Sequence, residues 1–437
     1  MKGTRTKIDN FFKENQMYYG DLDIDKNCRI FIDDMESGLL PDSESTLKML
    51  CTYISPEGEV PTQEPVIVID AGGTNFRVAL VTFDQEKNAV IEDFAMYAMP
   101  GSNGEISKEE FFDTILEYLR PVIHKSNKIG FCFSYPTEIM PNKDGRLIGF
   151  SKEVKVRDML GVLVGEELLK ALKERGIKDD KKIVMLNDTV ATALGGKAAY
   201  PDRKFDSYIG FILGTGTNTC YIEENNKIKK APTLKGLEGG TIINVESGGY
   251  GLAPRGLIDE TFDSTTVDPN TQKFEKMISG AYQGGLILEV IKKAAREGLF
   301  SAETTNSILD IEELTAREID EFCLYPYSNK NILGRISETE DDKMGIYYLI
   351  NGIIERAARL VVINLASIIL KINKGKNPCL PVCVVAEGTT FYKSVLFRDK
   401  MNHYVKTYMN DEKGIYCDFI QAENATLVGT ALAGLLN

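Results

Sequence analysis

The sequence contains no tryptophan and only two histidines, His124 and His403. Its eight cysteines are scattered along the chain, and the closest pair, Cys379 and Cys383, has no histidine beside it. A structural zinc site needs a compact set of cysteine and histidine ligands. The sequence therefore argues against such a site, and the cysteines, several of which lie in apolar segments, are expected to be buried free thiols.

Long apolar segments are also absent. The longest one, Leu360 to Leu370, is interrupted by Asn364 and Ser367, and it falls well short of the roughly 20 residues that a membrane-spanning helix requires. The segment from Met1 to Gly20 carries basic residues but no apolar core, which does not resemble a signal peptide. We therefore expect a cytoplasmic protein with no membrane partner.

Positive charge is scarce, because 51 lysines and arginines face 64 aspartates and glutamates, for a net charge of −13. This balance argues against a nucleic-acid partner, whose phosphates require clustered basic residues. It leaves room for a small anion held by backbone N–H groups. The length of 437 residues predicts two or three domains.

Two parts of the chain share the order apolar strand, Gly-Thr-Asn turn, strand. The first runs through residues 66–69, 70–75 and 76–83, and the second through 208–213, 214–218 and 219–222. The remaining pattern predicts helices over 163–175, 272–299, 346–372 and 425–436, and a buried strand over 381–386. The faint repeat indicates two similar halves that face a shared cleft.

The two Gly-Thr turns are candidate phosphate-binding loops. Glycine lets backbone N–H groups converge on an anion, and threonine adds a hydroxyl donor. A single such turn is more often an ordinary hairpin, so the interpretation depends on the pair. Asp70, at the end of its strand, is a candidate Mg²⁺ ligand, and Arg77 is a candidate phosphate contact. The candidate nucleotide-binding residues are Asp70, Gly72, Gly73, Thr74, Asn75, Arg77, Gly214 and Thr215.

A second group of polar side chains suits a sugar, whose hydroxyls both donate and accept hydrogen bonds. Its members are Ser134, Ser151, Lys152, Asn187, Asp188, Asn218, Glu246, Gln272 and Glu275. Asp188 is the candidate general base, although an aspartate at a helix start is commonly an N-cap. Lys152 is a candidate partner of the transferred phosphoryl group, or a solvated lysine. The non-functional interpretation is a solvated loop carboxylate for Glu246 and an exposed helix face for Gln272 and Glu275.

These segments together resemble the hexokinase family. The resemblance lies in Asp70 to Val78, Phe131 to Pro136, Phe150-Ser151-Lys152, Asn187 to Val190, Leu213 to Asn218, Gln272 to Gly280, and Glu387-Gly388-Thr389 with Tyr392-Lys393. They occur in the family's order from about Phe31 to the C-terminus. The last of them resembles the family's adenosine-binding segment, which adds Gly388 and Thr389 to the nucleotide-binding candidates.

The resemblance implies an α/β protein of the actin-like ATPase (ribonuclease H-like) fold, with two α/β domains flanking a deep cleft. The small domain would hold residues 65–187 and the C-terminal helix 424–437, and the large domain 1–64 and 188–423. ATP and Mg²⁺ would serve transfer of a phosphoryl group to the 6-hydroxyl of a hexose such as glucose, with Asp188 and Lys152 catalytic. The protein would be a monomer or homodimer.

Some positions depart from the family pattern. Ser247 follows Glu246 where the family usually has tryptophan, Ser151 stands in place of threonine, and Ala71 in place of leucine. These departures leave the identity of the sugar open. Three alternatives are a hexokinase-like sugar sensor without turnover, a bacterial glucokinase of the sugar-repressor group, and an actin-like filament or chaperone ATPase. The second is disfavoured because no Glu-x-Gly-His sequence is present near Glu246, and the third because it has no use for the sugar-binding set.

Overall fold

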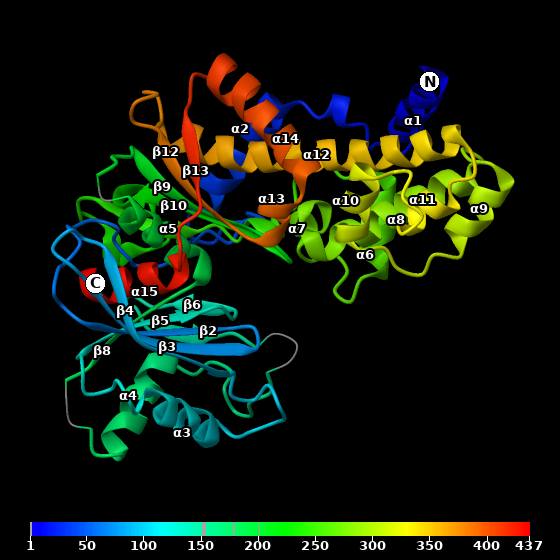
Figure 1. The fold of residues 1–437 in the computed structure, drawn as a ribbon. Coiled ribbons are helices and arrows are strands. Elements are labelled where there is room, and N and C mark those ends of the chain that lie inside the picture. Colours follow the sequence, from blue (N-terminus) through cyan, green and yellow to red (C-terminus); the bar gives the residue numbers. More distant parts are fainter. Residues whose placement is uncertain (1, 151–153, 178–179, 201) are drawn as a thin grey trace.

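The computed structural model describes residues 2–150, 154–177, 180–200 and 202–437. Two large β-sheets form its frame (Figure 1), with strand orders β4-β3-β2-β5-β8 and β1-β11-β10-β9-β12-β13. The first sheet contains β2 (Val66–Gly72), β3 (Asn75–Phe83), β4 (Ala89–Ala98), β5 (Lys128–Phe133) and β8 (Lys182–Leu186). The second contains β1 (Leu50–Cys51), β9 (Ser207–Leu213), β10 (Thr217–Glu224), β11 (Gly240–Asn244), β12 (Val382–Glu387) and β13 (Cys417–Ile420).

The first sheet is covered by helices on both faces, which explains the continuous apolar sequence over residues 66–69 of β2. Successive side chains of a strand point to opposite faces. Ile67 and Ile69 accordingly pack with helices α3 (Lys108–Leu119) and α4 (Val164–Glu174). Val66 and Val68 pack on the other face with α15 (Ala425–Leu436). A short hairpin, β6 (Thr137–Ile139) and β7 (Gly145–Leu147), lies beside this sheet.

The second sheet rests on α12 (Glu340–Ile372), whose 33 residues span about 50 Å. Its buried residues share one core with Ile209 and Phe211 of β9. In Figure 1 this helix crosses the whole upper lobe, and a group of helices gathers at its far end. The other helices of this lobe are α1 (Lys2–Glu14), α2 (Ile24–Gly38), α6 (Leu257–Thr265), α7 (Lys273–Ile278), α8 (Gly280–Arg296), α9 (Ala302–Leu309), α10 (Ala316–Leu324), α11 (Ile332–Ile336), α13 (Thr389–Lys393) and α14 (Val395–Tyr404).

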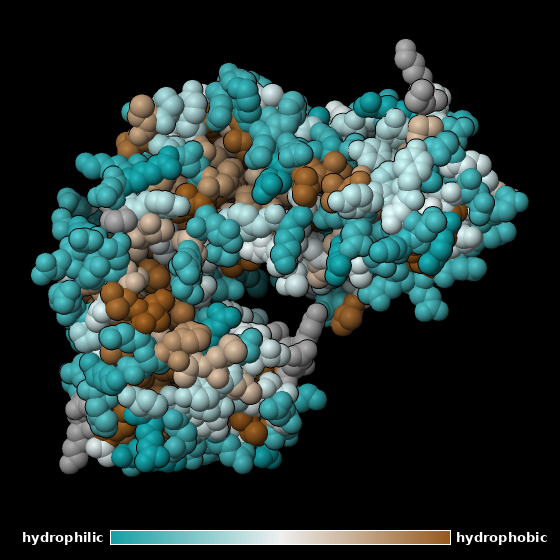
Figure 2. Space-filling model, in the orientation of Figure 1, coloured by the Kyte–Doolittle hydropathy of each residue, from teal (hydrophilic) through white to brown (hydrophobic). Residues whose placement is uncertain are grey.

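The two lobes meet where α5 (Asp188–Ala199) packs against α15. Glycines make this contact close. A Cβ atom added to Gly429 would lie 1.7 Å from the carbonyl oxygen of Ala191, and one added to Gly195 would lie 2.4 Å from that of Ala425. To the right of this joint, Figure 2 shows a deep hollow between the lobes.

Most of the predicted elements are confirmed, with one refinement. The predicted helical region 272–299 is two helices, α7 and α8, which are separated at Ser279. Five of the eight cysteines are buried, as expected for thiols in apolar segments. Within the described ranges, no helix combines the length and the apolar character needed to cross a membrane.

Candidate active site

Strand order brings several predicted site residues to one edge of the first sheet. Strands β2, β5 and β8 are parallel, with Asp70 opposite Cys132 and Cys132 opposite Leu186. Their carboxyl ends therefore coincide, which places Asp70, Ser134 and Asp188 along the same edge. The backbone N–H of Ser134 donates to the Ala71 carbonyl at 3.0 Å.

The first Gly-Thr turn is a tight hairpin between β2 and β3. Gly72 and Asn75 face each other, and Gly73 between them has a φ of 57°, which glycine adopts without strain. The phenol of Tyr135 donates to the Gly73 carbonyl at 2.7 Å and anchors the turn from below. Gly73, Thr74 and Asn75 are exposed, so the turn is open to a ligand.

The second Gly-Thr turn, between the antiparallel strands β9 and β10, touches the predicted adenosine-binding segment. The carbonyl of Gly214 accepts from the Gly280 N–H at 2.8 Å and from the Thr390 hydroxyl at 2.9 Å. A Cβ atom on Gly214 would lie 3.4 Å from the Cα of Gly388. Gly214, Thr215, Gly388 and Thr389, predicted separately from the sequence, thus form one neighbourhood.

Asn218 and Glu246 are brought together, as the sugar-binding prediction requires. The Glu246 Oε1 atom accepts from Asn218 Nδ2 at 3.4 Å and from Asn244 Nδ2 at 2.9 Å. Asn218 also donates to Asn244 Oδ1 at 2.8 Å. Glu246 is therefore not a freely solvated loop carboxylate. Sequence reasoning missed Asn244, whose signal was a polar residue that ends a buried strand two positions before Glu246.

Glu275 of helix α7 and Gln272, the residue at its N-cap position, both lie beside these segments. Glu275 Oε2 accepts from the Thr217 N–H at 2.9 Å, so it holds the end of the second turn. Gln272 Oε1 lies 2.8 Å from where a Cβ on Gly248 would be, next to the Glu246 segment. The alternative of a purely solvated helix face is therefore wrong for Glu275.

Asp188 is the first residue of α5, and Asn187 is its N-cap. The Thr189 N–H donates to Asn187 Oδ1 at 2.9 Å and to Asp188 Oδ1 at 2.7 Å. The suggested N-cap role of Asp188 is thus corrected, since the capping position belongs to its neighbour. Burial raises the pKa of Asp188, and the negative charges of Asp70 and Glu246 raise it further. The Cys220 thiol of β10 donates to the Thr189 carbonyl at 3.2 Å, so the strand that carries Asn218 lies beside the start of α5.

Asp70 is a buried carboxyl group that is paired with a cationic side chain. It is 7% exposed and pairs with Arg77 Nη1 at 3.2 Å, its cross-strand neighbour. Burial raises the pKa of Asp70 despite the opposing effect of Arg77. Among the described residues, no cluster of three or more histidine, cysteine, aspartate or glutamate side chains suits a metal ion. A lone carboxylate such as Asp70 is compatible with Mg²⁺, which usually keeps several waters and phosphate oxygens among its ligands.

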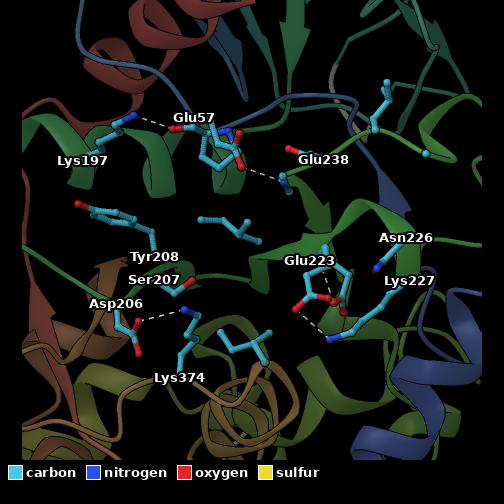
Figure 3. Close-up of a pocket in the computed structure, with 18 residues that line it drawn as sticks. Glu57, Lys197, Asp206, Ser207, Tyr208, Glu223, Asn226, Lys227, Glu238 and Lys374 are labelled. Carbon is cyan, nitrogen blue, oxygen red and sulfur yellow. Dashed lines mark hydrogen bonds and ion pairs between the residues drawn. The ribbon is translucent and has the colours of Figure 1, made fainter.

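Two predicted site residues, Ser151 and Lys152, lie outside the described residues. A pocket of about 790 Å³ lies elsewhere and is lined by none of the predicted site residues (Figure 3). Its lysines are engaged by the protein: Lys197 donates to the Pro56 and Gly58 carbonyls, Lys374 pairs with Asp206, and Lys227 pairs with Glu224. It is therefore not part of the candidate active site.

Known proteins with similar sequences belong to one family. Two family models, both described as hexokinase, match residues 10–198 and 208–436. Hexokinase-1 of Pongo abelii is 31% identical over 385 residues, covering 83% of this chain and 41% of its own length. Hexokinase-5 of Oryza sativa subsp. japonica is 30% identical over 371 residues, covering 79% of this chain and 72% of its own length.

Solved structures give the same result for the fold. The hexokinase from Schistosoma mansoni complexed with glucose has a TM-score of 0.75 at 23% identity, covering 100% of this chain and 99% of that one. A second hexokinase structure has a TM-score of 0.77 at 20% identity, with both chains covered completely. The architecture is therefore that of the actin-like ATPases, as predicted. Within that class, the chain belongs to the hexokinase family, and it spans 41% of the length of the first curated relative.

Proposed function

We propose that this protein transfers the terminal phosphoryl group of ATP to the 6-hydroxyl of a hexose. The observation that carries the proposal is the position of Asp188. The parallel strands β2, β5 and β8 bring it to the same sheet edge as Asp70, and the bond from the Cys220 thiol to the Thr189 carbonyl brings the strand of Asn218 beside it. A hexokinase needs a base, an anion site and a sugar site within reach of one another. The Schistosoma mansoni relative was solved with glucose, which makes glucose the first hexose to test.

In the proposed mechanism, Asp188 accepts the proton of the attacking hydroxyl. Glu246, held by Asn218 and Asn244, offers carboxylate oxygens to other hydroxyls of the sugar and fixes its orientation. Ser134, Asn187, Gln272 and Glu275 complete the proposed sugar site, together with Ser151 and Lys152. Lys152 would neutralise negative charge on the phosphoryl group during transfer.

The two turns would bind the ATP phosphates through backbone N–H groups and threonine hydroxyls. Asp70 would hold Mg²⁺ directly or through its waters, and the ion would supply neutralisation of phosphate charge. The proposed domains are those predicted from the sequence, residues 65–187 with 424–437 and residues 1–64 with 188–423. Closure of the hollow between them around the hexose would exclude water as a competing acceptor. The cytoplasmic location and the monomeric or homodimeric state stay predictions.

The test is a coupled assay of ADP release with Mg-ATP and a panel of hexoses. We expect turnover that depends on the sugar, because the proposed base, anion site and sugar site lie close to one another. Water as acceptor, with no hexose added, is the control. Hexose binding measured by calorimetry without any turnover would instead favour the alternative of a sugar sensor.

The pH dependence of the reaction should report Asp188. The base acts only when deprotonated, and its pKa is raised, so kcat/KM should fall as the pH drops through that raised value. We expect the acidic midpoint of kcat/KM to lie above the ordinary aspartate pKa of about 3.9. A profile at saturating Mg-ATP measures it. A midpoint at or below the ordinary value would contradict the role of Asp188 or its buried environment.

A further inference from the structure

A chain of three buried polar side chains leads from the protein core to the proposed sugar site. Asn364 of α12 donates from Nδ2 to the Thr219 hydroxyl at 2.7 Å, and the Thr219 and Ser247 hydroxyls lie 3.0 Å apart in a hydrogen bond. All three residues are completely buried. In the sequence Asn364 is merely an interruption of an apolar stretch, and Ser247 is the residue that replaces the family's usual tryptophan.

Thr219 and Ser247 each directly follow a proposed sugar ligand in the sequence. Thr219 follows Asn218, and its N–H donates to Asn218 Oδ1 at 2.7 Å. Ser247 follows Glu246, and the Thr219 carbonyl accepts from the Val245 N–H at 2.9 Å. The chain therefore fastens the backbone on both sides of the Asn218–Glu246 hydrogen bond.

Glu246 needs such fastening, because it has a left-handed backbone with a φ of 57°. Residues other than glycine keep this conformation only where their surroundings impose it. Ser247 directly follows Glu246, the left-handed residue. Its hydrogen bond to Thr219 fixes the direction in which the Glu246 side chain leaves the backbone. The Asn364 Oδ1 atom is buried and has no hydrogen-bond partner among the described residues. An unsatisfied buried oxygen reduces stability, so stability alone does not account for an asparagine at this position.

We propose that Asn364, Thr219 and Ser247 are positioning residues that hold Asn218 and Glu246 in the geometry that binds the hexose, an inference that rests on the proposed function. They are expected to act at the sugar and not at the nucleotide, because their side-chain hydrogen bonds join them to one another and, among the described residues, none reaches Gly214, Thr215 or Gly388. Loss of this series of hydrogen bonds should therefore weaken hexose binding and leave ATP binding unchanged. A merely structural role would instead lower stability without separating the two substrates.

The experiment compares Ser247→Ala and Asn364→Leu with the wild type. Calorimetry gives the hexose Kd, steady-state kinetics give the KM for hexose and for Mg-ATP, and thermal unfolding gives stability. We expect the hexose Kd and KM to rise about five- to tenfold in each variant, as the loss of one buried hydrogen bond implies, with the KM for ATP unchanged. Because the residues act as one chain, the double variant should bind hexose no more weakly than the weaker single variant.

Two further variants separate positioning from packing. Thr219→Val removes the hydroxyl and keeps the shape, whereas Thr219→Ser keeps the hydroxyl and should recover most of the hexose affinity that Thr219→Val loses. Ser367→Ala is the matched control, since Ser367 is a buried serine one turn further along α12 that bonds only within the core, to the Ile363 and Cys28 carbonyls. We expect it to bind hexose like the wild type.

The outcomes distinguish this inference from the function on which it rests. A wild type that neither binds nor phosphorylates any hexose would overturn both. An active wild type with hexose affinity unchanged in Ser247→Ala and Asn364→Leu would overturn the positioning role alone. Equal weakening of hexose and ATP in these variants would also overturn it.

Discussion

Replacement of Asp188 by alanine should lower kcat at least about 100-fold, because a positioned general base contributes that much or more to proton transfer. The Kd for hexose should change far less, since the proposed sugar site retains Asn218, Glu246 and its other ligands. Asp188→Asn, which keeps the shape but accepts no proton, should lose a similar factor. Steady-state kinetics with the preferred hexose and calorimetry of hexose binding give the two quantities.

The matched control is Asp399→Asn, which removes an exposed carboxylate on α14. It should leave both kcat and hexose affinity at the wild-type level. An unchanged kcat in Asp188→Ala would remove Asp188 from the role of base. If an unchanged kcat were accompanied by a large loss of hexose affinity, Asp188 would be a sugar ligand only.

Replacement of Gly429 by alanine should destabilise the protein. The new Cβ would lie 1.7 Å from the Ala191 carbonyl oxygen and 2.7 Å from the Gly195 nitrogen, which are backbone atoms that cannot turn aside. Alanine gains about 1 kcal/mol over glycine in a free helix, but overpacking of a tight contact typically costs 1–3 kcal/mol and occasionally more. We expect the clash to exceed the gain, with a net loss of about 2 kcal/mol from the free energy of unfolding, measured by urea denaturation.

Gly3→Ala is the control for this prediction. Gly3 lies in α1, and a Cβ added there would meet no atom within 4 Å, so alanine should be neutral or slightly stabilising. If Gly429→Ala proved as stable as Gly3→Ala, α5 and α15 would not approach each other as closely as described.

Local patterns predicted the elements that carry the site. The two hairpins follow from apolar strands that flank Gly-Thr turns, and α15 has the predicted bounds because its small apolar residues form one continuous run. The grouping of Asn218 with Glu246, and of Gly214 with Gly388, agrees with the resemblance to hexokinases. These parts depend on residues that are neighbours in sequence or that one family pattern includes.

The remaining parts depend on pairings that no local pattern contains. Asn364 lies 145 residues from Thr219, its hydrogen-bond partner, so an asparagine in an apolar stretch carried no sign of its role. The left-handed backbone of Glu246 could not be read from the residue type either, because glutamate does not favour that conformation. Nothing near Gly429 indicates that its neighbour in space is Ala191.

The packing of α15 also has a consequence for synthesis of the chain. Val66 and Val68 of β2 lie on the sheet face that α15 covers, and residues 425–436 leave the ribosome long after residues 66–133 have done so. Until then that face of the nascent sheet is apolar and uncovered, and such surfaces favour aggregation. We therefore expect nascent chains that stop short of residue 425 to bind chaperones, and release to follow soon after α15 emerges. Contacts this distant in sequence also favour slow folding, because the intervening loop must be closed first.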